Sequence, residues 1–218
     1  MRMRPVFFTA TVFLAFALLH SIGVSGSFKA FMARSVGGTW MRAYYRLSYT
    51  AFAILTTVVA AFVILLQSDV PVYRPPQVII RLMQGVQFLS LVIFYLGFKP
   101  FDLGYFTGIK QTVGYLRTGQ VSGDIEGMTE EGLITTGVYG LVRHPMYLAG
   151  IMLFAFESHF TAKSIVLRVL AIGYFIWGSL IEERRFTKRC GDIYQKYRKD
   201  VPMFNILKGL ALFLKSKS

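Results

Sequence analysis

The chain has 218 residues, of which 54% are hydrophobic and 16% charged, and its mean hydropathy is +0.51. Soluble domains of this length rarely combine such values, so a membrane protein is favoured over a soluble domain. The net charge of +13 would suit a nucleic-acid-binding protein, but the basic residues follow the apolar runs described below, which argues against nucleic-acid binding.

Apolar runs recur along the whole chain, and each is near the length needed to cross a bilayer as a helix. Arg2 and Arg4 before the first run would also suit a signal peptide, but no small-x-small cleavage site follows, so we expect an uncleaved first span. The sequence predicts an all-α, polytopic membrane protein with about five transmembrane helices. The runs occupy residues 6–19 (continuing to about 24), 47–66, 78–98, 146 to about 160, and 164–181.

The basic residues alternate with these runs. Three segments that should share one side of the membrane hold 18 of the 24 lysines and arginines: the segment between the first two runs, the segment between the third and fourth, and the tail after the fifth. The positive-inside rule places that side in the cytoplasm. We therefore expect an inner-membrane protein with its N-terminus outside and its C-terminus in the cytoplasm.

The chain reads as one membrane domain with two halves. Residues 1–98 form a scaffold of three spans, whereas residues 99–218 carry nearly all the polar density. The stretch 99–136 contains acidic residues from Asp124 to Glu131 and is long for a plain turn, which is typical of functional loops. Within it, residues 106–116 predict a short helix against the membrane surface.

The tail predicts a cytoplasmic helical cap. A helix should run through about Lys199 and end at Val201-Pro202. Its pattern suits a helix lying over a site or on an anionic lipid surface, and residues 206–214 are too short to cross the membrane and suit an interfacial segment. The single cysteine, Cys190, cannot form an internal disulfide, and a spectator thiol is favoured over a reactive or palmitoylated one. The residues expected on one face of the tail helix are Phe186, Ile193, Tyr194 and Tyr197.

Two polar motifs flank the last two apolar runs. Arg143-His144-Pro145 precedes the first of them and Glu182-Glu183 follows the second, with only a short turn at 161–163 between the runs. An antiparallel hairpin of two equal helices returns the chain to its starting level. The sequence therefore predicts that residues 143–150 and 182–186 meet at one membrane face.

These motifs predict a ligand site. Pro145 should begin a helix, which places His144 beside a positive helix N-terminus that favours an anionic group. Glu182-Glu183 would lie at a helix end where the dipole disfavours negative charge, so the pair needs compensation from Arg184 and Arg185, a bound polyol or a bound cation. The sequence shows no zinc-ligand spacing, dinucleotide or phosphate loop, or nucleophile elbow.

Residues 137–150, GVYGLVRHPMYLAG, together with Glu182-Glu183 and residues 191–202, GDIYQKYRKDVP, resemble the signature of the isoprenylcysteine carboxyl methyltransferase and phospholipid methyltransferase superfamily. The first half of the chain resembles a narrower group. His20-Ser21, Lys29, residues 45–49 and residues 102–106 are similar to NnrU-type proteins and membrane methanethiol S-methyltransferases.

The resemblance implies an S-adenosylmethionine (SAM) site at the cytoplasmic end of the last two spans. The methyl acceptor would be a small or lipophilic thiol, amine or carboxylate, arriving from the cytoplasm or from the lipid bilayer, and no resident metal is implied. Arg143 and Arg198 would act in catalysis, Arg198 by closing the site. The residues implied in cofactor binding are Gly137, Tyr139, Gly140, His144, Pro145, Tyr147, Gly150, Glu182 and Glu183.

Two other functions stay open. Membrane enone and sterol reductases share a related C-terminal signature but bind NADPH, and the Glu182-Glu183 pair argues against a dinucleotide phosphate. The NnrU-like first half also fits a non-catalytic accessory protein in nitrogen-oxide metabolism.

Overall fold

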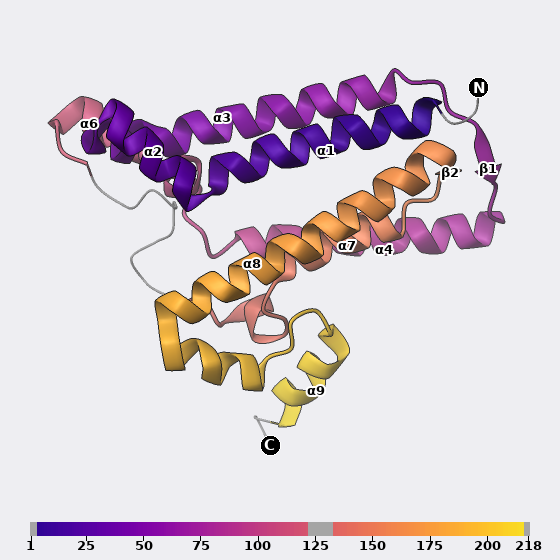
Figure 1. Ribbon diagram of the computed structural model, residues 1–218. Helices are drawn as coiled ribbons and strands as arrows, with labels where there is room; N and C mark the ends of the chain where they lie inside the picture. Colours follow the sequence, from indigo (N-terminus) through magenta and orange to yellow (C-terminus); the bar gives the residue numbers. More distant parts are fainter. Residues whose placement is uncertain (1–3, 122–132, 216–218) are drawn as a thin grey trace. The chain divides into compact units, whose positions relative to one another are not determined.

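The computed structural model describes residues 4–121 and 133–215 (Figure 1). The acidic stretch from Asp124 to Glu131, expected in a functional loop, lies outside these residues. The chain divides into two compact units. Unit 1 comprises Met1–Ser68 and Phe101–Gly132, and unit 2 comprises Asp69–Pro100 and Leu133–Ser218.

Unit 1 is built around a pair of long helices that lie side by side, α1 and α3, with α2, α5 and α6 packed on α3 (Figure 1). The hydroxyl of Thr112 on α6 donates to the carbonyl of Ala43 on α3 at 2.8 Å. The expected helix at 106–116 is two helices, broken at Gly108, whose φ of +90° lies in the left-handed region that favours glycine. The elements are α1 (Arg4–Val24), α2 (Gly26–Val36), α3 (Gly38–Leu65), α5 (Leu103–Thr107) and α6 (Ile109–Thr118).

In unit 2, α7 packs against both α4 and α8. Two short strands pair antiparallel, with Pro71 opposite Thr161 and Tyr73 opposite Phe160. The elements are β1 (Pro71–Tyr73), α4 (Gln77–Phe98), the 3₁₀ helix η1 (Gly137–Gly140), α7 (Pro145–Ala155), β2 (Phe160–Thr161), α8 (Ala162–Asp200) and α9 (Ile206–Lys215).

Four helices in the described ranges are long and apolar enough to cross a membrane: α1, α3, α4 and α8. Their surfaces carry large apolar side chains that stay exposed, such as Leu65 at 75% and Phe88 at 70%, as expected for faces that meet lipid rather than water. The predicted fold class, an all-α polytopic membrane protein, is confirmed.

The expected length of the fourth span was wrong. Helix α7 has 11 residues, about 16 Å at 1.5 Å per residue, and ends at Ala155 instead of continuing to about residue 160. The carboxylate of Glu157 accepts a hydrogen bond from the backbone N–H of His159 at 2.9 Å, and Phe160 pairs with β1. Residues 157–159 are not helical and lead into β2, so the two helices of the hairpin are unequal.

Helix α8 ends at Asp200, close to the predicted boundary, but it is sharply bent at Gly191. The bend divides the orange ribbon of Figure 1 into a long first part and a short tail helix. Gly191 has φ +51° and ψ −126°, a conformation that L side chains rarely adopt. Of the residues expected on one face of the tail helix, Tyr194 and Tyr197 are buried, whereas Ile193 is 71% exposed.

Candidate active site

The two motifs of the hairpin meet in unit 2. His144 is the N-cap of α7, directly before Pro145, and the glutamate pair lies on α8 just beyond its apolar part. The imidazole Nε2 of His144 lies 2.8 Å from a carboxylate oxygen of Glu183, and Nδ1 lies 3.2 Å from a carboxylate oxygen of Glu182. The predicted convergence of residues 143–150 and 182–186 is therefore confirmed, although it does not depend on equal helices.

Glu183 is the centre of this cluster. The guanidinium of Arg143 donates to both of its oxygens, from Nε at 2.9 Å and from Nη2 at 3.1 Å. The hydroxyl of Tyr194 donates to it at 2.5 Å, and Nε of Arg198 lies 3.2 Å away. The side chain of Glu183 is only 9% exposed, so these partners replace the water that the carboxylate would otherwise bind.

Glu182 is held differently. Its side chain is 36% exposed, and its interaction with His144 is longer than that of Glu183. One carboxylate of the pair is thus enclosed by protein donors, while its neighbour stays partly open to solvent.

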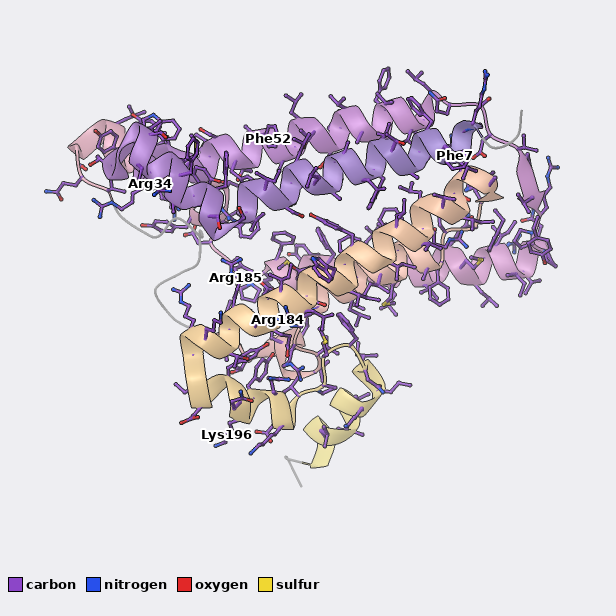
Figure 2. All side chains as sticks on the ribbon, in the orientation of Figure 1. Phe7, Arg34, Phe52, Arg184, Arg185 and Lys196 are labelled. Atoms are coloured by element: carbon purple, nitrogen blue, oxygen red, sulfur yellow. The ribbon has the colours of Figure 1, made fainter. Side chains whose placement is uncertain are left out.

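The explanation based on a helix end was wrong. The glutamates lie within α8, which continues to Asp200, so they do not stand at the negative end of a helix dipole. Their compensation comes from Arg143, His144 and Arg198. Figure 2 shows Arg184 and Arg185, the cations that the sequence suggested for this role, along α8 before the bend; both are exposed.

Neighbouring charges shift the pKa values of two members of the cluster, His144 and Glu183. Burial lowers the pKa of His144, but the hydrogen bonds and negative charge of Glu182 and Glu183 outweigh burial and hold it above its ordinary value of 6.5. Burial raises the pKa of the Glu183 carboxyl, but the hydrogen bonds from His144, Arg143 and Tyr194 outweigh that effect and lower it to about 2. Both shifts favour the charged forms, a protonated His144 and an ionised Glu183, which attract each other.

The chain after α8 forms a strap across the first motif, which we define as residues 201–205. The backbone N–H of Arg143 donates to the carbonyl of Pro202 at 3.0 Å, and that of His144 donates to the carbonyl of Met203 at 3.4 Å. The guanidinium of Arg143 also donates to the carbonyls of Arg198, at 3.2 Å, and Val201. Arg143 thus joins the hairpin, the tail helix and the strap.

Two tyrosines extend the connection to α4. The hydroxyl of Tyr197 donates to the carbonyl of Tyr139 at 2.5 Å, and the hydroxyl of Tyr139 donates to the carbonyl of Gly97 at 3.1 Å. Burial raises the pKa of both hydroxyls far above the ordinary value of 10, so they stay protonated and can keep donating. The tail helix is therefore anchored to η1, and η1 to α4.

The remaining residues implied by the resemblance lie close to this cluster or support it. Gly137 and Gly140 begin and end η1. The ring of Tyr147 packs edge-on against the His144 ring, with centroids 5.6 Å apart. Gly150 serves helix packing, because a Cβ there would stand 2.6 Å from the ring of Phe175 on α8.

Sequence reasoning missed three contributors. Tyr194 was expected only on one face of the tail helix. Its hydrogen bond to Glu183 depends on the bend at Gly191, which the residue pattern does not predict. Phe204 lies beside His144, with ring centroids 6.2 Å apart. The strap acts through backbone carbonyls, which leave no signal in side-chain chemistry.

Within residues 4–121 and 133–215, no group of three or more histidine, cysteine, aspartate or glutamate side chains is placed to hold a metal ion. The cluster instead pairs carboxylates with arginine and histidine.

Unit 1 holds the residues that resemble NnrU-type proteins. The hydroxyl of Tyr49 lies 2.9 Å from Nε2 of His20, and Nε of Arg46 donates to the carbonyl of Phe106 at 2.6 Å. Asp102 caps α5 by accepting from the N–H groups of residues 104 and 105. These contacts join α1, α3 and α5 within the unit.

Fold and cluster together define an all-helical, polytopic membrane protein with a buried ionic cluster where a helical hairpin meets its tail. The profile of the NnrU protein family matches residues 8–214, so the chain belongs to the NnrU family.

Curated relatives carry a more specific name. The chain is 26% identical over 202 residues to methanethiol S-methyltransferase of Pseudomonas sp. strain GM41, covering 89% of this chain and 70% of that protein. It is 28% identical over 195 residues to methanethiol S-methyltransferase of Pseudomonas deceptionensis and 25% identical over 188 residues to methanethiol S-methyltransferase 2 of Bradyrhizobium diazoefficiens; each alignment covers 86% of this chain and 68% of the relative. No solved structure matches the chain significantly.

Proposed function

We propose that this chain is an integral-membrane methyltransferase that transfers a methyl group from SAM to a small thiol. The observation that carries the proposal is the ionic cluster of His144, Glu182 and Glu183, which joins the two halves of the methyltransferase-like signature. The names of the relatives support both the reaction and the thiol acceptor.

The donor set of the cluster suits SAM. The amino-acid end of SAM carries an ammonium and a carboxylate, and its ribose carries a diol. Glu182, 36% exposed, can accept from the ammonium or the diol, and Arg198, 43% exposed, can bind the carboxylate. Tyr147 and Phe204, beside His144, offer aromatic surface for the adenine.

We assign the enclosed residues to positioning. Arg143 donates its hydrogen bonds to Glu183 and to carbonyls of the tail, and its side chain is 9% exposed. Glu183 in turn holds His144 and Tyr194 in place. In this assignment Glu182 and Arg198 touch the cofactor, and Arg143 acts through Glu183.

When bound, SAM supplies a methyl group already activated by a sulfonium, so the protein's task is to position the acceptor and exclude water. With His144 protonated, three cationic side chains, Arg143, His144 and Arg198, face the two carboxylates Glu182 and Glu183. This excess of positive charge lowers the pKa of a nearby thiol and so favours the nucleophilic thiolate.

We also propose that the cluster faces the cytoplasm, where SAM is made. The segments flanking it are the basic ones, and the positive-inside rule places them there. Single cysteines at Gly119 and Lys208, in a Cys190→Ser background, test this orientation: a membrane-impermeant maleimide should label neither in intact cells and both in inverted vesicles. Labelling from outside would contradict the orientation.

The test of function is binding and turnover by the purified protein. Calorimetric titration in detergent should show SAM binding, and radiolabelled SAM should transfer its methyl group to methanethiol but not to phospholipid amines or prenylcysteine analogues. NADPH binding in place of SAM would favour the reductase. Failure to bind SAM, by protein that still restores a nitrogen-oxide growth phenotype, would favour the accessory function.

A further inference from the structure

Helix α9 has three distinct faces. Leu207, Leu210 and Leu214 recur at spacings of three and four residues, so they share one face, and they are 77%, 45% and 61% exposed. Gly209 is buried on a second face. Lys208 is exposed on the third.

The buried face is docked closely. A Cβ at Gly209 would stand 1.8 Å from the carbonyl oxygen of Leu141, a distance that no side chain tolerates. Leu141 lies just after η1 and four residues before α7 begins. The backbone of α9 therefore rests on the segment that carries the first motif, and this contact fixes which face points outward.

Helix α9 also continues the strap. Asn205 begins the helix: its side-chain oxygen accepts from the N–H of Lys208, and its carbonyl accepts from the N–H of Gly209, both at 2.9 Å. Pro202 and Met203, which accept from the backbone of the Arg143-His144 motif, lie only a few residues earlier. Any contact that fixes the position of α9 therefore also fixes the strap over the cluster.

The outward face matches a lipid surface. Three leucines left in water would be unfavourable, by about 1.5 kcal/mol or more for each side chain that could be fully buried. Residues 201–218 contain Lys208, Lys215 and Lys217 and no acidic residue, which complements anionic headgroups. Helix α7, which begins four residues after Leu141, is apolar, so lipid is the expected surrounding of this part of the chain.

We propose that α9 lies in the plane of the membrane, with Leu207, Leu210 and Leu214 among the acyl chains and Lys208 at the anionic headgroups. The helix then fixes the strap, and with it the His144–Glu183 cluster, at the bilayer surface. The inference rests on the geometry of α9 and not on methyl transfer.

The test uses the full-length protein with Cys190→Ser, in nanodiscs of phosphatidylcholine with or without phosphatidylglycerol. A fluorophore whose emission depends on polarity is attached to Leu207→Cys, Leu210→Cys or Leu214→Cys, and to Lys208→Cys as the matched control on the same helix. Spin-labelled lipids should quench the three leucine positions several-fold more than position 208. Anionic lipid should increase that quenching.

Two variants separate lipid insertion from docking. Leu207→Asp with Leu214→Asp should abolish lipid quenching of a probe at position 210, while Gly209→Leu should displace α9 from Leu141 and raise proteolysis of the tail. Melting curves confirm that each variant is folded.

Equal, weak quenching at all four labelled positions would overturn the proposal. Probes shielded from water but not quenched by lipid, together with disulfide cross-links between position-207 cysteines, would overturn it in favour of a second copy of the chain covering α9.

Discussion

The two ends of the α7–α8 hairpin both carry charged side chains, but they organise them differently. At the end near β2, Lys163 lies 3.8 Å from Asp69, and Glu157 lies 3.8 Å from Arg168 and 2.7 Å from the imidazole of His159, which is 85% exposed. At the other end a single carboxylate, Glu183, holds two arginines, a histidine and a tyrosine at 2.5–3.2 Å.

The contacts at the two ends of the hairpin differ in kind. Arg168 also donates to the carbonyl of Glu157 at 2.6 Å and lies over the ring of Phe160, with 4.4 Å between its guanidinium carbon and the ring centroid. That end fixes the turn and the short strands. The Glu183 end concentrates charge beyond what a turn requires and leaves Glu182 and Arg198 partly open, which is consistent with the proposed ligand site.

The largest effect is expected from Glu183→Gln. The change leaves Arg143 and His144 buried beside a neutral amide, and breaking a buried ion pair from one side typically costs about 3–5 kcal/mol. Thermal unfolding in detergent measures the loss. Its matched control is Glu182→Gln, the neighbouring and more exposed carboxylate, for which the expected loss is under about 1 kcal/mol. Equal losses in the two variants would remove the distinction between them.

Glu182→Gln should affect the ligand instead. If Glu182 touches SAM, the change weakens SAM binding tenfold or more, about 1.4 kcal/mol, at nearly unchanged melting. Calorimetric titration gives the affinity. The control at the other end of the hairpin is Glu157→Gln, which should leave SAM binding as it was. The assignment fails if Glu182→Gln binds SAM like the wild type.

Arg198→Ala should lower methyl transfer more than stability. Its side chain is 43% exposed, so its pair with Glu183 is screened by water and contributes at most about 1 kcal/mol. The expected result is a reduced turnover and a weaker SAM affinity with a melting temperature close to the wild type. Lys199→Ala, an exposed cation on the next position, serves as control. Unchanged turnover in both variants would remove Arg198 from the site.

The pH dependence of stability should reveal His144. Because its pKa is raised in the folded state, its stabilising contribution is complete below the ordinary value of 6.5 and is lost as pH rises through the folded pKa. Glu183, lowered to about 2, contributes above 4.5 and loses that contribution as pH falls toward 2. The cluster should therefore stabilise most between about pH 4.5 and 6.5.

Melting temperatures from pH 5 to 9 test this window. Wild type should lose stability above pH 6.5, and His144→Gln should lose less over the same range. His159→Gln is the control from the other hairpin end, where the imidazole side chain is 85% exposed. A decline of the same size in both variants would assign the pH dependence to other groups.

The smallest effect on ligand binding is expected from Arg168→Gln. It removes a contact to the Glu157 carbonyl and the stacking on Phe160, so stability should fall by about 1–2 kcal/mol. SAM affinity should stay within twofold of the wild type. A large loss of affinity would show that the two ends of the hairpin are coupled.

The sequence predicted the parts that depend on local pattern. The apolar runs located α1 and α4 almost to the residue, and Pro145 marked the start of α7. Their order around a short turn was enough to bring His144 to Glu183. The proximity of His144 and Glu183 was therefore predictable from the apolar runs and the position of Pro145.

The parts that escaped prediction depend on distant or backbone contacts. Helix α7 ends early because Phe160 pairs with Tyr73, a partner far away in the chain. Gly191 could have been an ordinary helical glycine, and only its positive φ turns Tyr194 onto Glu183. The sequence could not tell the enclosed Glu183 from the more exposed Glu182. The difference depends on which partners, such as Arg143 and Tyr194, reach each carboxylate in the folded protein.

The strap has a consequence for how this protein can change over evolutionary time. Pro202 and Met203 hold the Arg143-His144 motif through their carbonyl oxygens, which every amino acid possesses. The side chain of Met203 is therefore free to change without opening the strap, whereas Pro202 also ends α8 and Glu183 supplies the carboxylate that holds Arg143 and His144. Among relatives, position 203 should vary in residue type while the strap keeps its length. A single inserted residue between Tyr197 and Asn205 should do more damage than most substitutions there.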